Sequence, residues 1–316
     1  NGCPVFFSCM IRGVKNGPSP KWLRDQIESI GLRSISSLVD ITNFFTMDRA
    51  RPLHVFDSDK IEGGLRVSFA KGNESIDALD EKNYSLPKDA MIISDASGII
   101  SIAGIMGGVS TGCSENTVNV LLESAYWDPI TIAKAGRALK INSDARYRFE
   151  RGVDPDFTKD GILLGAQMIM NLCGGTASNI VETGKVPNFY REYKLNPNKV
   201  QSLVGMEIDQ NTQINILNSL GFNYNKGIVS PPPWRPDILG EANLVEEIAR
   251  VSSLTKLRGV PLPKLKQNKT SSTLTPIQKR ESVIRREIAS LGYNECVTYS
   301  FVDKKSALIF GGGSDQ

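Results

Sequence analysis

Short apolar runs separated by turn residues occupy the middle of the chain's first half, and they constrain the fold more than any other feature. The runs are residues 65–69, 90–94, 99–103 and 118–122, and their length and spacing are typical of strands. Helical patterns flank them. One pattern follows Ser19, which is expected to cap it, and one runs from Asp154-Pro155 to Gly174-Gly175. Strands mixed with helices predict a large α+β domain with three layers.

A polar stretch rich in Pro and Asn, residues 182–199, marks a domain boundary. We expect domains over residues 1–187, 188–262 and 263–316. The second holds a helical pattern over 209–220, a strand pair near 222–229 and a helix over about 241–254, which fits a small winged-helix-like domain. The third begins with a linker, followed by a capping box at Thr275 and Gln278 that starts a helix. We expect a strand after that helix.

Composition limits the possible chemistry. The chain has one histidine, His54, so a Ser-His-Asp triad would have to use it and a two-histidine zinc site is excluded. Five cysteines without CxxC spacing argue against a disulfide framework and favour a reducing compartment, with cytoplasm as the default location. A net charge of +3 permits contact with nucleic acid without demanding it. No apolar run approaches the roughly 20 residues of a membrane helix.

Residues 139–155, LKINSDARYRFERGVDP, alternate charged and aromatic side chains unusually densely. An ordinary solvated helix face does not explain this pattern. The charges are expected to pair with one another or with a polyanion.

Three candidate site features each have a structural alternative. The glycines of AGIMGG, residues 103–108, suit either a tight turn or a backbone that approaches a ligand. Glu123 follows an apolar run, where a carboxylate is costly to bury without a donor, so it suits a structural salt bridge or a ligand contact. His54 stands beside apolar residues and suits a structural histidine or a site residue.

A helix after Asp237 carries Asn243, Glu246 and Glu247 at spacings that place their side-chain oxygens on one face. Such oxygen ligands suit Mg²⁺. The alternative is a solvated acidic face in which Glu246 pairs with Arg250.

Six segments together resemble the beta subunit of bacterial phenylalanyl-tRNA synthetase. They are the run over residues 139–155 and, in the family's order, the strings SLVDITNF, RPLHVFD, AGIMGG, VLLESAYWDP and PPPWRPDILGEANLVEEIARV. The resemblance covers essentially the whole chain. It implies a large tRNA-editing module, a small domain and the start of a class II catalytic-like domain.

The resemblance also implies partners. In that family the beta subunit pairs with an alpha subunit in an alpha2beta2 holoenzyme, and the alpha subunit holds the aminoacylation site. ATP is therefore expected to be used by the holoenzyme and not bound here. The large module of the family hydrolyses tyrosine wrongly esterified to tRNA(Phe).

Residue roles follow from the matching positions. By the resemblance, Glu123 would bind the tyrosine para-hydroxyl and Gly107 would supply backbone close to it. His54 and Ala145 would line the same pocket, which makes His54 and Glu123 the candidate catalytic residues. Asn43 is a further substrate-binding candidate.

Asp237, Asn243, Glu246 and Glu247 match the family's magnesium positions, in a site shared with the alpha subunit. Asn243 departs from the pattern, because an aspartate is usual there, and one negative charge is lost.

A rival hypothesis is a non-catalytic RNA-binding and subunit-docking scaffold. It rests on the basic run after Arg250, which contains no acid before Glu281. The same run also suits a solvated linker. Because Phe310 runs into a glycine-rich ending, the chain is interpreted as a piece of a longer polypeptide.

Overall fold

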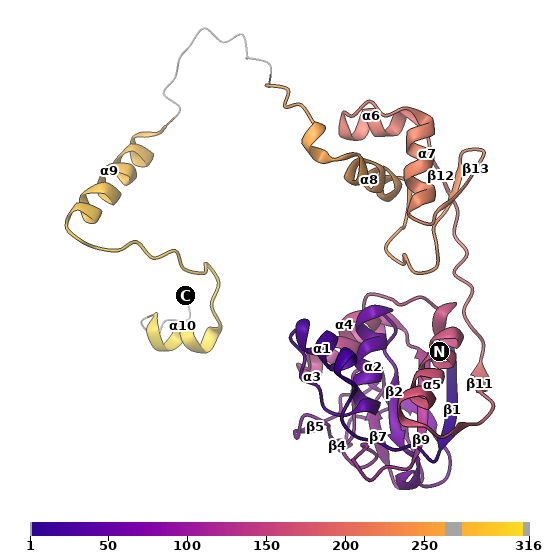
Figure 1. The fold of residues 1–316 in the computed structure, drawn as a ribbon. Coiled ribbons are helices and arrows are strands. Elements are labelled where there is room, and N and C mark those ends of the chain that lie inside the picture. The colour runs from indigo at the N-terminus through magenta and orange to yellow at the C-terminus, as the bar shows by residue number, and fades with distance from the viewer. Residues whose placement is uncertain (1, 263–273, 312–316) are drawn as a thin grey trace. The chain divides into compact units, whose positions relative to one another are not determined.

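The computed structural model describes residues 2–262 and 274–311 and is a mixed α+β structure with several open sheets (Figure 1). It forms two compact units, residues 1–257 and 258–316. The first unit contains two hydrophobic cores, a large one with members from Val5 to Cys173 and a small one with members from Leu195 to Ala249. None of the helices in the described ranges has the length and apolar content that crossing a membrane requires.

The main sheet of the large core is antiparallel and has the strand order β10-β1-β9-β2, with β11 also paired to β1. Its strands are β1 (Val5–Arg12), β2 (His54–Asp57), β9 (Asn119–Tyr126), β10 (Thr176–Ala177) and β11 (Val181–Gly184). Alternate residues of β1 are fully buried, as expected of a strand that packs on one face.

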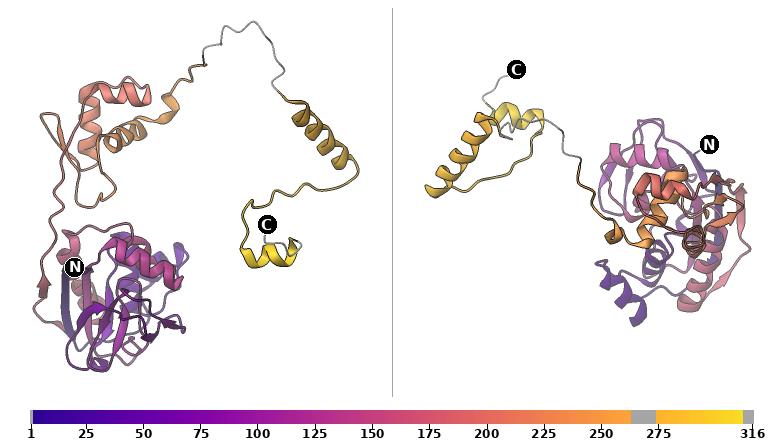
Figure 2. Two further views of the ribbon diagram at one scale, coloured as in Figure 1. Left: turned by 180° about the vertical axis from the view of Figure 1, so that it is seen from behind. Right: turned by 90° about the horizontal axis from the view of Figure 1, so that it is seen from above.

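Three helices cover one face of this sheet, with α5 packed on β1 and β9 (Figure 2). They are α1 (Lys21–Ser29), α2 (Ser37–Asp48) and α5 (Phe157–Cys173). The Ser124 hydroxyl donates to the Thr158 carbonyl of α5 at 2.8 Å, and Gly165 of α5 packs against Leu122. Because side chains alternate along a strand, Glu123 points to the opposite face.

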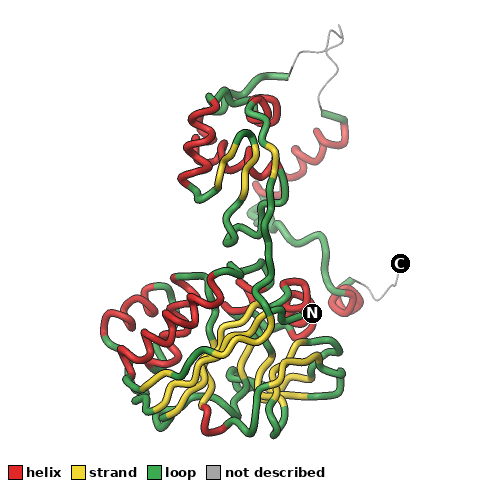
Figure 3. Tube along the Cα trace, turned by 90° about the vertical axis from the view of Figure 1, so that its right-hand side faces the viewer, coloured by secondary structure: helices red, strands yellow, loops and turns green. Residues whose placement is uncertain are grey.

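A second antiparallel sheet has the order β3-β6-β7-β8, and its strands form a separate group in Figure 3. The elements around it are β3 (Arg66–Phe69), β4 (Ser75–Asp77), β5 (Asn83–Ser85), β6 (Met91–Ser94), β7 (Ile99–Ile102), β8 (Met106–Gly107), the 3₁₀ turn η1 (Ser58–Lys60), α3 (Pro129–Leu139) and α4 (Asp144–Phe149). The strands predicted over 65–69, 90–94 and 99–103 are confirmed. The run over 118–122 is the start of a longer strand, so Glu123 lies inside β9 and does not end it.

Two predicted helix starts differ from the structure. Ser19 does not cap α1, because its hydroxyl donates to the buried carboxylate of Asp40 at 2.6 Å. Asp40 also accepts the backbone N–H of Ile35 at 2.9 Å, so it ties the segments around α2 together. Asp154 lies before α5, and its carboxylate accepts the N–H of Asp156 at 2.9 Å.

A buried arginine joins three segments of the large core. Arg51, 1% exposed, donates to the carbonyl of Ala125 at 3.1 Å and to the carbonyl of Asp154. Its Cγ lies 2.8 Å from the position that a Cβ would take at Gly161 of α5. Burial lowers the pKa of Arg51 to about 10, so the guanidinium stays charged at neutral pH and anchors the approach to β2.

The small core contains β12 (Tyr193–Lys194), α6 (Asn198–Val204), α7 (Gln210–Ser219), β13 (Asn223–Asn225), β14 (Ile228–Ser230), α8 (Glu241–Ser252) and the 3₁₀ turn η2 (Leu254–Lys256). The predicted helices and strand pair of this region are present, together with α6 and β12, which were not predicted. The three strands form one sheet in the order β12-β14-β13. The winged-helix-like fold stays a prediction.

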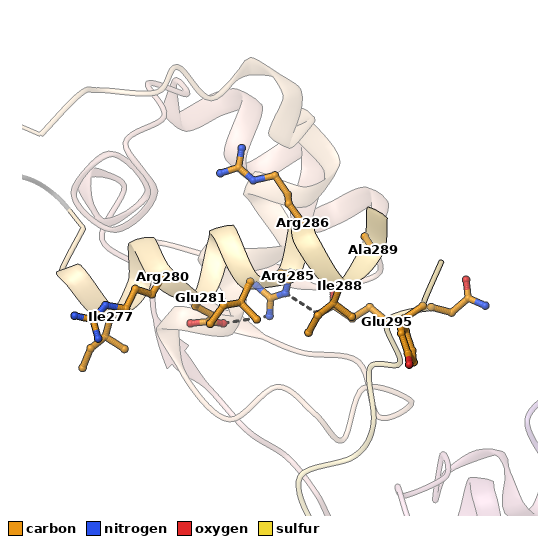
Figure 4. A pocket seen from close by; sticks show the side chains of 11 residues that line it. Ile277, Arg280, Glu281, Arg285, Arg286, Ile288, Ala289 and Glu295 are labelled. Atoms are coloured by element: carbon orange, nitrogen blue, oxygen red, sulfur yellow. Dashed lines mark hydrogen bonds and ion pairs between the residues drawn. The ribbon is translucent and has the colours of Figure 1, made fainter. Parts of the chain in front are cut away.

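The second unit contains α9 (Pro276–Ser290) and α10 (Lys304–Phe310). The predicted capping box is present, because the Thr275 side chain and the Gln278 side chain each bond the other's backbone N–H. Figure 4 shows the α9 face around Arg285, which pairs with Glu281 at 3.2 Å and Glu295 at 2.8 Å. The prediction of a strand after α9 was wrong. The described residues 293–303 contain no strand, since a strand needs a neighbour to pair with.

We predict that Arg51→Met lowers the free energy of unfolding by about 2–4 kcal/mol, because two carbonyls lose a charged donor in a buried place. Urea unfolding followed by circular dichroism measures the change. Arg49→Met is the control, since the Arg49 side chain is 60% exposed. Equal losses for the two variants would contradict the anchoring role of Arg51.

Candidate active site

Strand register places His54 and Glu123 side by side. In the antiparallel pair β2–β9, His54 is the direct partner of Glu123, and on the other side of β9 the partner of Glu123 is Ser8. Directly opposed residues of an antiparallel pair have Cβ atoms about 5 Å apart on the same face. The carboxyl and the imidazole therefore share the sheet face that is turned away from α5.

A small cavity of about 70 Å³ lies at this place. Four of the five candidate editing residues line it: His54, Gly107, Glu123 and Ala145. The structure thus brings together side chains from β2, β8, β9 and α4. Asn43 belongs to α2, is half-buried and is not among the lining residues.

The glycine-rich segment forms the wall opposite the sheet. A Cβ built at Gly107 would lie 2.5 Å from Cε1 of His54 and 2.9 Å from its Nε2. Its backbone is nevertheless in a region that other residues adopt, since it has no positive φ. Gly107 is therefore required for space beside the imidazole and not for backbone conformation.

Helix α4 completes the cavity through Ala145, and its start is fixed to the glycine-rich segment. The Ser143 hydroxyl donates to the carbonyl of Ile105 at 2.7 Å and accepts the N–H of Arg146 at 3.1 Å. One side-chain oxygen thus caps the helix and joins it to the cavity wall.

Burial changes the ionisation of both polar residues in the cavity. Glu123 is 5% exposed, and desolvation raises its pKa to about 8. Desolvation lowers the pKa of His54 to about 4. At pH 7 the pair is therefore an uncharged carboxylic acid beside a neutral imidazole. Glu123 Oε2 has no hydrogen-bond partner among the described residues, so the carboxyl is free to bond an occupant of the cavity.

Sequence reasoning missed two residues near this site. Arg51 anchors the segment that leads into β2, and Trp127 lines the cavity directly after β9. The arginine in RARPLH and the tryptophan in AYWDP were visible, but their burial depends on contacts with distant segments.

The charges of the run over residues 139–155 pair with one another. Arg146 bonds Glu150 at 3.0 Å, Arg148 bonds Asp144 at 3.1 Å, and Arg151 bonds Glu150 at 2.8 Å. The Arg151 guanidinium also lies 3.7 Å from the ring centre of Tyr147. Of the two expectations for this run, internal pairing is the one that the structure shows.

The candidate magnesium residues are arranged around an arginine. Arg235 bonds Asp237 at 2.8 and 2.6 Å and Glu247 at 2.7 Å. Glu247 is also bonded by Arg250 at 2.9 Å. Hydrogen bonds from these arginines hold the pKa values of Glu247 and Asp237 below their ordinary range.

The other two candidates, Asn243 and Glu246, do not share these hydrogen bonds with Arg235 and Arg250. Asn243 Oδ1 accepts the N–H of Leu239 at 3.1 Å, and Glu246 is exposed. The described residues contain no cluster of three or more His, Cys, Asp or Glu side chains placed to hold a metal. As arranged, the residues do not fit a magnesium site, because Arg235 already bonds the carboxylates of Asp237 and Glu247. The magnesium site stays a prediction.

We predict that Gly107→Ala lowers the free energy of unfolding by about 1–3 kcal/mol, because the added methyl group overlaps the His54 ring. The same change in a His54→Ala background should cost at least about 1 kcal/mol less, since the overlapping ring is gone. Chemical denaturation of the four proteins in this cycle measures the coupling. Additive costs would show that Gly107 and His54 are not packed against each other.

We predict a pH-dependent gain in stability for Glu123→Gln. The folded-state pKa of about 8 lies above the ordinary value of 4.5, so folding keeps a proton that the unfolded chain loses as pH rises. The stability that this group contributes to the wild type is complete below pH 4.5 and is lost as pH rises through 8, by up to roughly 5 kcal/mol. Melting temperatures of both proteins from pH 4 to 9 should therefore diverge in favour of the variant. Parallel curves would refute the raised pKa.

Comparison with known proteins supports one family along the whole chain. Three family models match in order: the B3/4 domain at residues 2–174, the tRNA synthetase B5 domain at 193–253, and the phenylalanyl tRNA synthetase beta chain CLM domain at 262–316. The phenylalanine–tRNA ligase beta subunits of Ruegeria pomeroyi and Cereibacter sphaeroides are 58% and 59% identical over 315 and 314 residues. That of Paramagnetospirillum magneticum is 45% identical over 320 residues.

These alignments cover 99–100% of this chain but only 39–40% of the relatives, so the chain spans about 40% of the length of the curated relatives it matches. A solved N-terminal fragment of the phenylalanyl-tRNA synthetase beta subunit from Pyrococcus horikoshii is 14% identical, with a TM-score of 0.36 over 78% of this chain and 70% of that one. The ordered family models and the high identities carry the assignment: the chain belongs to the family of phenylalanine–tRNA ligase beta subunits.

Proposed function

We propose that this chain contributes hydrolytic editing to a phenylalanine–tRNA ligase: it removes tyrosine wrongly esterified to tRNA(Phe). The observation that carries the proposal is the buried, unpaired carboxyl of Glu123 at the cavity wall beside His54. The match of the surrounding residues to the B3/4 domain supports the same site.

The chemistry of the cavity suits selection of a hydroxyl group. A synthetic site that must admit phenylalanine excludes an added hydroxyl only weakly, by a factor of about 100. A site built to bond that hydroxyl rejects the analogue that lacks it by factors of about 10⁴–10⁵, because buried polar groups then remain unpaired. Glu123 would bond the tyrosine hydroxyl, and Gly107 would leave room beside it.

Ester hydrolysis then requires an oriented water molecule. His54 is the candidate for holding it, because a neutral imidazole accepts a hydrogen bond. With a pKa of about 4, His54 is a weak base at pH 7. We therefore assign most of the rate to positioning of the ester, with a terminal hydroxyl of the tRNA assisting. Ala145 would shape the pocket, whereas the role of Asn43 stays a prediction.

Other functions belong to the rest of the enzyme in this proposal. Aminoacylation and ATP use are assigned to an alpha subunit in an alpha2beta2 assembly, and this chain would contribute contacts to that subunit and to tRNA(Phe). A magnesium ion at the Asp237 position would require the partner to draw Arg235 away from the carboxylates. We expect isothermal titration of the chain alone with Mg²⁺ to show no binding, and binding by the isolated chain would contradict this.

We predict that Glu123→Ala lowers the cleavage rate of tyrosyl-tRNA(Phe) by about 10-fold, since leaving the buried tyrosyl hydroxyl without its partner costs about 1–3 kcal/mol. Single-turnover deacylation with purified chain measures it, with phenylalanyl-tRNA(Phe) as the second substrate. Glu115→Ala is the matched control, because Glu115 is exposed. An unchanged tyrosyl rate in Glu123→Ala would remove Glu123 from the mechanism.

The rival function is a non-catalytic RNA-binding and subunit-docking scaffold, and the basic run after Arg250 is its basis. Arg250 is engaged by Glu247, while Lys264, Lys266 and Lys269 lie outside the described residues. This hypothesis predicts tRNA binding that weakens steeply as the salt concentration rises, together with no ester cleavage. Binding measured at several salt concentrations beside the deacylation assay separates the two functions.

A further inference from the structure

The cavity has a second unpaired polar atom that the proposed function does not use. Trp127 lines the cavity and is 1% exposed. Its Nε1 has no hydrogen-bond partner among the described residues. Buried tryptophan N–H groups usually have a partner, and leaving such a donor unpaired costs about 1–3 kcal/mol. An unpaired donor at a cavity therefore points to an occupant that would accept its hydrogen bond.

Packing shows which edge of the indole lies against Gly104. A Cβ built at Gly104, itself a lining residue, would lie 2.8 Å from Trp127 Cδ1. Nε1 is covalently bonded to Cδ1, so the donor belongs to the edge beside Gly104. Gly104 has φ +67°, a conformation that other residues rarely adopt. The absence of a side chain at Gly104 thus lets its backbone lie directly against this edge of the indole. The ring is held in place by an edge-to-face contact with Phe6 at 6.3 Å.

The two unpaired atoms have complementary hydrogen-bonding character. Glu123 Oε2 can accept a hydrogen bond and Trp127 Nε1 can only donate one. A hydroxyl group both donates and accepts, so one phenolic hydroxyl within reach of both atoms would satisfy both. A phenyl ring satisfies neither and would leave both buried groups without partners.

We propose that Trp127 is a specificity-determining residue, whose indole N–H donates to the phenolic hydroxyl that Glu123 also binds. This inference rests on the proposed function and adds a second recognition group to it. The hydroxyl would be held from two sides, which fixes its position as well as its identity.

The test compares single-turnover cleavage of tyrosyl- and phenylalanyl-tRNA(Phe) by wild type and by two variants. Trp127→Phe removes the donor together with ring volume. Replacing Trp127 with 3-benzothienylalanine, in which sulfur takes the place of N–H, removes the donor and keeps the shape. We expect each change to lower the tyrosyl-to-phenylalanyl rate ratio about five-fold, the value of one net neutral hydrogen bond of about 1 kcal/mol. Trp22→Phe is the control, since Trp22 is 47% exposed.

The outcomes separate this inference from the proposed function. If wild type is selective and the benzothienyl variant is equally selective, Trp127 has no recognition role while the editing proposal stands. If wild type, tested with and without an added alpha subunit, does not prefer the tyrosyl ester, both proposals fail.

A binding measurement on the wild-type protein decides the question without a substitution at Trp127. The chain has three tryptophans, so ¹⁵N-labelled protein gives three indole N–H resonances, and Trp22→Phe and Trp234→Phe identify the third by elimination. We expect p-cresol to shift the Trp127 resonance and toluene, which lacks the hydroxyl, to leave its N–H in the unbonded position. Equal responses to both compounds, or none, would overturn the inference.

Discussion

The buried guanidinium of Arg51 is the interaction on which the large module depends. It bonds backbone carbonyls of Ala125 in β9 and of Asp154 before α5, and it packs on Gly161. An apolar side chain could fill the same space but would leave those carbonyls without a donor. Since His54 follows three residues later, the position of the imidazole is set by the same contact. The large core and the candidate site therefore share one anchor.

The candidate site departs from the rule that buried polar atoms have partners. Within the described part of the chain, Glu123 Oε2 and Trp127 Nε1 are both buried without a partner, and both residues line the same small cavity. Elsewhere in this module the buried carboxylate of Asp40 has partners, because it accepts the Ser19 hydroxyl and the Ile35 amide, whereas Asp80 Oδ1 has none among the described residues. Two unpaired polar atoms at one cavity, one of them on a carboxyl whose pKa is raised by desolvation, are typical of sites that bind or react.

Sequence patterns predicted the elements whose determinants are local. The capping box at Thr275 and the short strands of the second sheet depend on neighbours along the chain, and the predictions of both were confirmed. Ser19 was wrong as a cap because its hydroxyl bonds Asp40, a contact between distant segments. The sequence around Glu123 and His54, taken alone, favoured structural roles for both residues. Only the resemblance to a family predicted that they line one pocket. Spacing along α8 could not show that Arg235 enters from the preceding loop.

Pairing of β2 with β9 has a consequence for how this protein tolerates changes in chain length. Adding or deleting one residue just before β2 would turn His54 to the helix-covered face, and a deletion would bring Val55 opposite Glu123, because side chains alternate. Such a slip would disturb the hydrophobic core, since Val55 is buried in it, and the site would be lost as well. Insertions and deletions among natural variants should therefore avoid residues 49–53 and concentrate in turns such as 71–74, where no cavity residue depends on register.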